Sequence, residues 1–208
     1  MRKPFNSRRM LKVSYLIVLS LVLFGCGSET NFQIEGKVPD SSYDGEWIYL
    51  VPLVNAPVER VDSTIIKNGA FTFEGYVELP EVYIIRTRPL FRLSLQELLV
   101  IKEPGLIHTY MAKNSITGGT ALNDSLHHWK QEKQVFDEKL RLIQQSLQNS
   151  NEADSLILNQ QLDTLNISKI NFHYNFALNN KNNVVGQLVL RMMSSSFTDE
   201  QKSHFATE

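Results

Sequence analysis

The pattern of apolar and polar residues divides the chain into a β-rich first part and a helical second part. From Phe32 onward apolar residues alternate with polar ones, as at Ile34 and Val38, which is typical of a strand buried on one face. Further strands are predicted at residues 47–51, 58–66, 70–77, 82–85, 98–101 and 106–111. Short strands separated by turn residues over residues 32–113 indicate an antiparallel β-sandwich or an open-barrel-like module.

Two short motifs mark turns between these strands. Asn68-Gly69 separates two apolar runs, and both residue types tolerate positive φ, so the dipeptide predicts a β-hairpin formed by the strands on either side. Glu103-Pro104-Gly105 predicts a turn between the last two strands.

From Leu122 the apolar residues recur at alternating intervals of four and three, which predicts helices. The first seam consists of Leu122, Leu126, Trp129, Lys133, Phe136, Leu140, Ile143 and Leu147. The second seam consists of Leu158, Leu162, Leu165, Lys169, Phe172 and Phe176. Because only the polar residues 148–151 separate them, we predict an antiparallel helical hairpin, capped at its start by Asn123 or Asp124.

Two short helices are predicted to follow the hairpin, over residues 184–193 and 200–205. Thr198 and Gln201 form a capping-box signal before the second of them. The expected fold class is therefore α+β, with a helical region over residues 120–208 that packs on the β-rich part or extends from it. Phe197 and Phe205 are expected to be less well buried than they would be if a second domain followed.

The N-terminal residues have the features of an export signal. The basic side chains of residues 1–25 are Arg2, Lys3, Arg8, Arg9 and Lys12, and this stretch contains no acid. The apolar run over residues 13–24 is shorter than the roughly 20 residues that a spanning helix needs. We therefore predict a signal peptide rather than a permanent membrane span.

The end of that apolar run resembles the bacterial lipobox. The resemblance rests on Leu23, Gly25 and Cys26, whereas Phe24 is larger than the residue usual at its position. It implies cleavage before Cys26, a diacylglycerol thioether on Cys26 and an acylated new N-terminus. Residues 26–31 would then be a polar tether after the lipid. The alternative is an ordinary secretory signal with a chance cysteine.

Lipidation has consequences for location and chemistry. We expect the chain to be lipid-anchored in the bacterial cell envelope, at the outer membrane, with the leaflet left open. Cys26 is the only cysteine, and thiol–disulfide exchange requires an attacking thiolate. A mature chain whose sole sulfur is a thioether is therefore predicted not to perform that reaction.

The distribution of charge argues against nucleic acid as the main partner. The leader holds five of the 21 basic side chains, so 16 remain against 22 acidic ones. A chain with this excess of acid has no basic field for phosphates. For the same reason we expect membrane attachment to come from the lipid rather than from surface charge.

The order of motifs in the β-rich part resembles a known family. The motifs are Phe32-x-Ile-x-Gly36, Trp47-Ile-Tyr-Leu50, Asp62-Ser63, Asn68-Gly69-x-Phe71-x-Phe73-x-Gly75, Pro80-x-x-Tyr83 and Glu103-Pro104-Gly105, with later ones at residues 118–123 and 180–186. Together they are similar to a domain-of-unknown-function family (family 4369) of Bacteroidetes-type lipoproteins. There the domain often precedes a thioredoxin-like domain of the TlpA/ResA or AhpC-TSA type. We expect this chain to lack that domain, because it has no Cys-x-x-Cys motif, and no catalytic residue carries over.

One side-chain set has the spacing of metal ligands. Asp124, His128 and Glu132 are four residues apart on one helical face, and His108 or His173 would supply a further ligand. We favour the alternative, a solvated helix face with both of those histidines packed in apolar surroundings. No metal or other cofactor is therefore predicted.

Other candidate groups also have structural explanations that we favour. Asp62-Ser63 is expected to be a turn rather than a nucleophile with its carboxylate, and Gly118-Gly119-Thr120 a helix start rather than a phosphate loop. The methionines at 192 and 193 are expected in the core. Glu78, Glu81, Arg86, Arg88 and Arg92 are expected to form charged edges.

The sequence thus favours a non-enzymatic envelope lipoprotein that acts as a binding, spacing or assembly module. One alternative is an accessory to a thioredoxin-like oxidoreductase, or the truncated stump of one. A further alternative is a small-molecule binder or hydrolase that uses the interface between the β-rich part and the helices.

Overall fold

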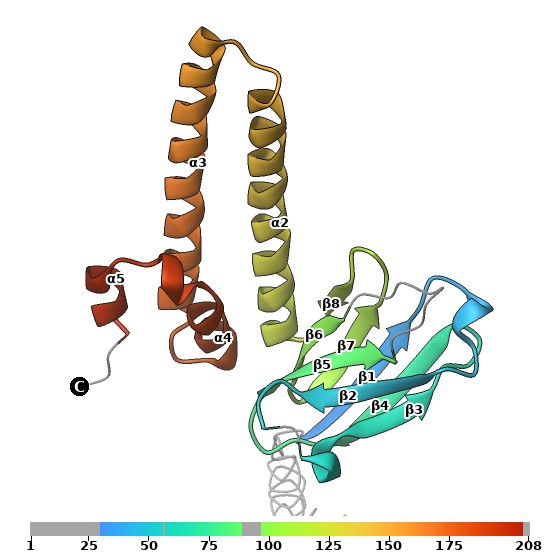
Figure 1. Ribbon diagram of the computed structural model, residues 1–208. Helices are drawn as coiled ribbons and strands as arrows, with labels where there is room; N and C mark the ends of the chain where they lie inside the picture. Colours follow the sequence, from blue (N-terminus) through green and yellow to red (C-terminus); the bar gives the residue numbers. More distant parts are fainter. Residues whose placement is uncertain (1–29, 56, 89–96, 206–208) are drawn as a thin grey trace, which may run out of the picture.

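The chain folds as an α+β protein in which an open β-sandwich is followed by helices (Figure 1). The computed structural model describes residues 30–55, 57–88 and 97–205. Two four-stranded sheets face each other, and neither closes into a barrel. The predicted fold class is confirmed, in its sandwich form.

Each sheet combines strands from different parts of the β-rich region. Sheet A has the order β4 (Ala70–Tyr76), β1 (Asn31–Lys37), β7 (Gly105–Tyr110) and β8 (Ile116–Gly118). Sheet B has the order β3 (Asp62–Ile65), β2 (Trp47–Pro52), β5 (Glu81–Thr87) and β6 (Leu98–Lys102). All pairs are antiparallel except β1 with β7, which are parallel. The expectation of a wholly antiparallel sandwich is therefore wrong at this one pair.

The predicted turn at Asn68-Gly69 is present, but the predicted hairpin is not. Both residues have positive φ, 53° and 69°, and the Asp44 carboxylate accepts hydrogen bonds from both of their backbone N–H groups. The strands on either side then separate, β3 into sheet B and β4 into sheet A, and only Lys67 and Ala70 form a bridge. The turn therefore forms a corner between the two layers.

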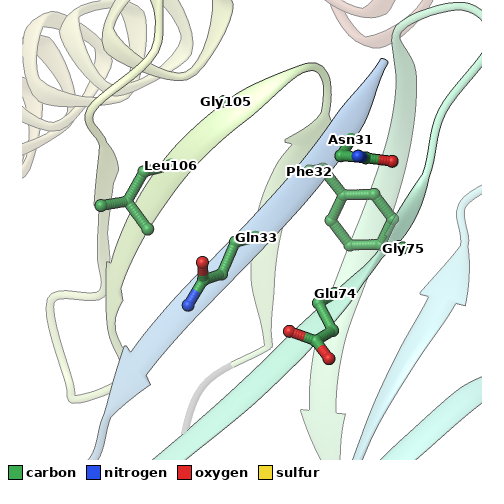
Figure 2. A pocket seen from close by; sticks show the side chains of 7 residues that line it. All are labelled: Asn31, Phe32, Gln33, Glu74, Gly75, Gly105 and Leu106. Carbon is green, nitrogen blue, oxygen red and sulfur yellow. The ribbon is translucent and has the colours of Figure 1, made fainter. Parts of the chain in front are cut away.

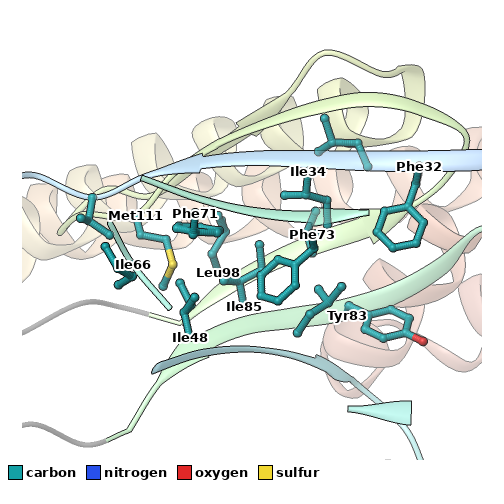
Figure 3. Packing of buried hydrophobic residues seen from close by; sticks show 14 of the residues in the cluster. Phe32, Ile34, Ile48, Ile66, Phe71, Phe73, Tyr83, Ile85, Leu98 and Met111 are labelled. Carbon is teal, nitrogen blue, oxygen red and sulfur yellow. The ribbon is translucent and has the colours of Figure 1, made fainter. Parts of the chain in front are cut away.

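The sandwich core lies between the inward faces of the two sheets (Figure 3). In β1 every second residue is buried, as the alternating pattern predicts. Ile34 and Phe73 of sheet A face Ile85 and Tyr83 of sheet B (Figure 3). Gly36 has no room for a side chain, because a Cβ there would lie 2.0 Å from the Phe71 ring.

The predicted helical hairpin is confirmed, with α2 (Ala121–Leu147) and α3 (Glu152–Asn179) side by side. Each helix is about 40 Å long at 1.5 Å per residue. Asn151 caps α3 by accepting a hydrogen bond from the Asp154 backbone N–H. The last helices are α4 (Val184–Met193) and α5 (Asp199–Ser203), with the predicted capping box at Thr198. Short 3₁₀ turns also occur at η2 (Ser41–Tyr43), η3 (Val58–Arg60) and η4 (Ser194–Ser196).

A second apolar core joins the base of the hairpin to the outer face of sheet B. Val82 and Ile101 of the sheet pack with Leu126, Trp129, Ala177, Val185, Leu188 and Val189 of the helices. Beyond this core the hairpin projects away from the sandwich (Figure 1). We call residues 133–169 of α2, α3 and their connection the arm.

The C-terminal aromatic residues pack together. Phe197 is buried, because it packs against Tyr174 and Phe205. Phe205 is partly buried. Within the described ranges, none of the helices combines the length and the apolar character needed to span a bilayer.

Candidate functional site

A buried polar cluster fixes where the hairpin leaves the sandwich. The Asn123 side-chain amide accepts from the Ile101 backbone N–H at 2.9 Å and donates to the Ile101 carbonyl oxygen at 2.8 Å. Because β6 is an edge strand of sheet B, this amide takes the place of a neighbouring strand. Asn123 also accepts a hydrogen bond from the buried Thr117 hydroxyl, so the helix is attached to both sheets.

Glu103 caps the first helix from outside it. Its carboxylate accepts hydrogen bonds from the backbone N–H groups of Leu122 and Asn123, each at 3.0 Å, and from the Thr120 hydroxyl at 2.6 Å. A carboxylate at this end also interacts favourably with the helix dipole. Thr120 is the N-cap residue, so the cap predicted at Asn123 or Asp124 is wrong, whereas the prediction of a helix start at residues 118–120 is confirmed.

Above this joint the hairpin encloses a buried histidine. The Trp129 indole N–H donates to His173 Nδ1 at 3.1 Å, and His173 is 1% exposed. Burial, reinforced by the positive charges of Lys169 and Lys133, lowers the pKa of His173 to about 4. The ring is therefore neutral near pH 7, with its proton on Nε2, which has no hydrogen-bond partner in the described structure. The prediction of a packed His173 is confirmed.

A single carboxylate joins the two lysines of the predicted seams. Asp137 lies 2.5 Å from Lys133 Nζ and 2.5 Å from Lys169 Nζ. Partial burial raises the pKa of Asp137, but hydrogen bonds and charge from the two lysines lower it below its ordinary value overall. Sequence reasoning missed Asp137, although its spacing of four from Lys133 was a signal for an ion pair.

The outer part of the arm carries an open apolar groove between α2 and α3. The groove has a volume of about 630 Å³ and is lined by Lys139, Leu142, Ile143, Ile157, Gln160, Gln161, Thr164, Leu165 and Ser168. Leu142 and Ile157 are 48% and 55% exposed. Leu156 and Ile167 are exposed as well, so apolar side chains surround α3 rather than lying on one face. Such a helix is normally covered on several sides.

Smaller hollows lie on the described part of the sandwich. One, of about 570 Å³, lies on sheet A beside the start of β1, where Gly75 and Gly105 flank Phe32 in register (Figure 2). The other, of about 560 Å³, lies where β3 and β4 separate and includes the half-exposed Trp47. The groove on the arm is the more apolar of these surfaces and is the candidate binding site.

The candidate metal-ligand residues, for which the sequence favours a solvated helix face, lie on α2 without a further ligand among the described residues. Asp124 and His128 are exposed on α2 and Glu132 is half-buried, and the described ranges contain no cluster of three or more His, Cys, Asp or Glu residues placed to hold a metal ion. His108 is exposed and lies 3.7 Å from Glu35. The expectation that His108 is packed in apolar surroundings is therefore wrong, because its strand position faces solvent.

The other singled-out residues mostly have structural roles. Asp62 and Ser63 are the first two residues of strand β3, so the prediction of a turn at these residues is wrong, and the Asp62 carboxylate accepts a local hydrogen bond from the Ser63 backbone N–H at 2.7 Å. Three of the predicted charged-edge residues have polar partners: Glu81 pairs with Arg60, Arg86 with Glu97 and Arg88 with the Tyr49 hydroxyl.

The predictions for the remaining residues have different outcomes. Met192 is 45% exposed, so its assignment to the core is wrong, whereas Met193 packs against the second core. Glu78 is exposed. Arg92 and the lipobox residues Leu23, Phe24, Gly25 and Cys26 lie outside the described residues. Lipidation of Cys26 therefore stays a prediction.

The β-sandwich and its joint to α2 define the class of domain. The family model described as "Domain of unknown function (DUF4369)" matches residues 32–126, which include the described strands, except for Asn31 of β1, and the start of α2. The resemblance drawn from the sequence is confirmed over these residues. The motif at residues 180–186 lies beyond the match and stays a prediction. No curated protein and no solved structure matches the chain.

Proposed function

We propose that this chain is a non-enzymatic lipoprotein of the bacterial cell envelope that binds a protein partner on its helical arm. The observation that carries this proposal is the uncovered apolar surface of α3, where Leu156, Ile157 and Ile167 are each more than half exposed. Exposed apolar side chains beside an apolar groove are typical of interaction sites. The sandwich would serve as the base that holds the arm in one direction through Asn123 and Glu103.

The chemistry of the groove favours a helical segment as the bound element. Two antiparallel helices leave a groove into which a third helix fits with apolar residues at i, i+3, i+4 and i+7. Leu142 and Ile157 would contact that apolar stripe. Lys139, at the groove, would pair with an acidic residue of the partner helix. The arm extends about 22 Å along α2 beyond residue 133, which would place the partner at a distance from the sandwich and accounts for a spacing role.

The identity of the partner is tested by crosslinking within living cells. A photoreactive amino acid replaces Leu142 in the groove. The matched control replaces Gln144, which is also exposed but lies about 200° around the helix. We expect Leu142 to give one discrete adduct with an envelope protein and Gln144 to give none. A thioredoxin-like oxidoreductase in that adduct would identify the partner class that the family resemblance implies.

Groove variants establish that the adduct reports specific binding. Ile157→Glu places a charge on the apolar surface and should abolish the Leu142 adduct, whereas Gln144→Glu should leave it unchanged. An adduct between two copies of the chain would show self-assembly instead of a separate partner. The proposal is contradicted if Leu142 gives no protein adduct, or if the adduct persists in the Ile157→Glu variant.

The lipid anchor has an independent test. Cys26→Ser removes the acceptor sulfur, so acyl labelling should be lost and the protein should move from the membrane fraction to the soluble fraction. A single acyl chain anchors only weakly, whereas several give stable attachment. Unchanged membrane attachment of Cys26→Ser would contradict lipidation.

A further inference from the structure

One end of the sandwich carries the two most exposed large apolar side chains among the described residues. Val58 of η3 is 84% exposed, and Leu79 of the loop between β4 and β5 is 75% exposed. Tyr76 at the end of β4 and Val54 after β2 are exposed beside them in the chain. Single exposed apolar residues are ordinary, but four from two neighbouring segments at one end form a surface.

The sheet topology places all four residues at the end where the described chain begins. β1 starts at Asn31, which pairs with Tyr76 at the end of β4. In sheet B, Pro52 at the end of β2 pairs with Tyr83 near the start of β5. Residues 53–55, 57–61 and 77–80 therefore lie at the same end as the start of β1, and Figure 1 shows η3 at this end.

Polar contacts hold these loops in place. Arg60 forms an ion pair with Glu81 and donates a hydrogen bond to the Tyr83 hydroxyl at 3.2 Å. Val58 and Leu79 each lie two residues before a member of that ion pair. The ammonium group of Lys102 lies over the Phe32 and Tyr83 rings, 5.2 Å and 4.7 Å from their centroids. The exposed apolar side chains are thus presented by a structured end of the sandwich.

The spacing between Cys26 and the described chain limits what this end can face. Thr30 follows Cys26 by four residue steps, which span about 14 Å at most when fully extended. β1 alone spans about 23 Å, so the opposite end of the sandwich lies much further from the anchor. A lipid on Cys26 would therefore keep the end with Val58 and Leu79 close to the bilayer.

We propose that the anchor-side end, defined by Val54, Val58, Tyr76 and Leu79, contacts the surface of the bilayer that holds the lipid on Cys26. This inference rests on the proposed lipidation. Aliphatic side chains enter the boundary between headgroups and acyl chains, and tyrosine is enriched at that depth. The arm leaves the sandwich on the side away from η3 (Figure 1), so this contact directs the arm away from the membrane.

The charges at this end indicate which membranes it contacts. Arg60 and Lys102 are accompanied by Glu59, Glu78 and Glu81, so this end has no excess of positive charge. Binding through apolar side chains does not require anionic lipids, whereas a polybasic surface does. The contact is therefore expected on uncharged phosphatidylcholine vesicles.

Fluorescence quenching tests the contact on the lipidated full chain. Leu79→Trp is reconstituted into phosphatidylcholine vesicles whose acyl chains carry bromine, a quencher that acts over short distances. The matched control is Leu142→Trp on the arm, and the unsubstituted chain supplies the background from Trp47 and Trp129. We expect the tryptophan at 79 to be quenched at least about twofold, as for a side chain within the 5–10 Å interfacial layer, and the one at 142 not to be quenched. Equal quenching at the two positions would overturn the proposal.

A second tether separates this proposal from the lipidation on which it rests. If the lipidated preparation does not float with vesicles, the anchor proposal has failed. The same variants then carry an N-terminal hexahistidine segment in place of the leader and bind a nickel-chelating lipid. Adding Val58→Glu to Leu79→Trp should reduce quenching on either tether, whereas adding Val135→Glu should not. Unchanged quenching in the Val58→Glu variant would contradict the contact.

Discussion

The sandwich and the arm bury their apolar residues to different degrees. Ile34 and Ile107 are fully enclosed between the sheets, whereas the seam residues Leu158 and Leu162 of the arm are only half-buried. A pair of helices covers only one face of each, so the outer part of the arm lacks a third layer. The difference indicates that the sandwich supplies most of the stability and that the arm keeps apolar surface available for binding.

Truncation of one apolar side chain in each region tests this difference. Ile34→Ala should lower the free energy of unfolding by about 4 kcal/mol, because it removes buried methyl groups and leaves a cavity. Leu162→Ala should lower it by only about 1 kcal/mol, because that side chain is already partly in water. Urea unfolding followed by circular dichroism measures both values. Equal losses would show that the arm is packed as tightly as the sandwich.

Acidification should destabilise the base of the hairpin through His173. Its folded-state pKa of about 4 lies below the ordinary value of 6.5. Above pH 6.5 the His173 ring is neutral in both the folded and the unfolded chain, so its titration does not lower the free energy of unfolding there. As pH falls from 6.5 to 4 the unfolded chain binds a proton that the folded chain does not, and stability falls by about 3 kcal/mol.

The matched variants isolate this effect from other titrating groups. His173→Phe removes the ring that titrates and should therefore show a flatter dependence of unfolding free energy on pH between 4 and 6.5. His108→Gln, at an exposed position, should behave like the unsubstituted chain. Identical pH profiles for His173→Phe and the unsubstituted chain would contradict the assigned role of burial.

Substitutions at the joint between the sandwich and the helices should lower the free energy of unfolding less than truncation in the sandwich core. Asn123→Ala leaves the Ile101 backbone N–H and carbonyl and the Thr117 hydroxyl without their partner, at a cost of about 2 kcal/mol. Asp124→Asn, which keeps a side-chain oxygen beside Gly119, should change stability by less than about 0.5 kcal/mol. Thermal unfolding of the two variants compares them, and a larger loss in Asp124→Asn would refute the importance of the buried amide.

Local patterns predicted the elements of the fold because their causes are local. Alternation around Ile34 identifies a strand with one buried face, and the spacing from Leu122 identifies the helix that follows. The turn at Asn68-Gly69 was also predictable, since both residue types tolerate the positive φ that the turn requires. The pairing of the strands was not predictable from local patterns. β3 and β4 pair with strands of different sheets, and the parallel pair joins β1 and β7, which lie far apart in the sequence.

The candidate site was only partly predictable. The seams identified which faces of α2 and α3 meet, but Asn123 was interpreted as a cap because its partner Ile101 lies 22 residues away. The apolar residues Leu156, Ile157 and Ile167 lie off the seam and were a signal that α3 has a second apolar face. The seam residues alone do not show this second face, and the groove exists only because α2 and α3 lie side by side.

Amide hydrogen exchange of the purified chain tests the central difference between the two regions most directly. The account predicts that backbone amides of residues 139–165, which lack a covering layer, exchange at least about tenfold faster than those of β1 and β7. On addition of the partner identified at Leu142, the amides of the arm should slow while those of the sandwich stay unchanged. Equal protection of the arm and the sandwich in the chain alone would contradict the account.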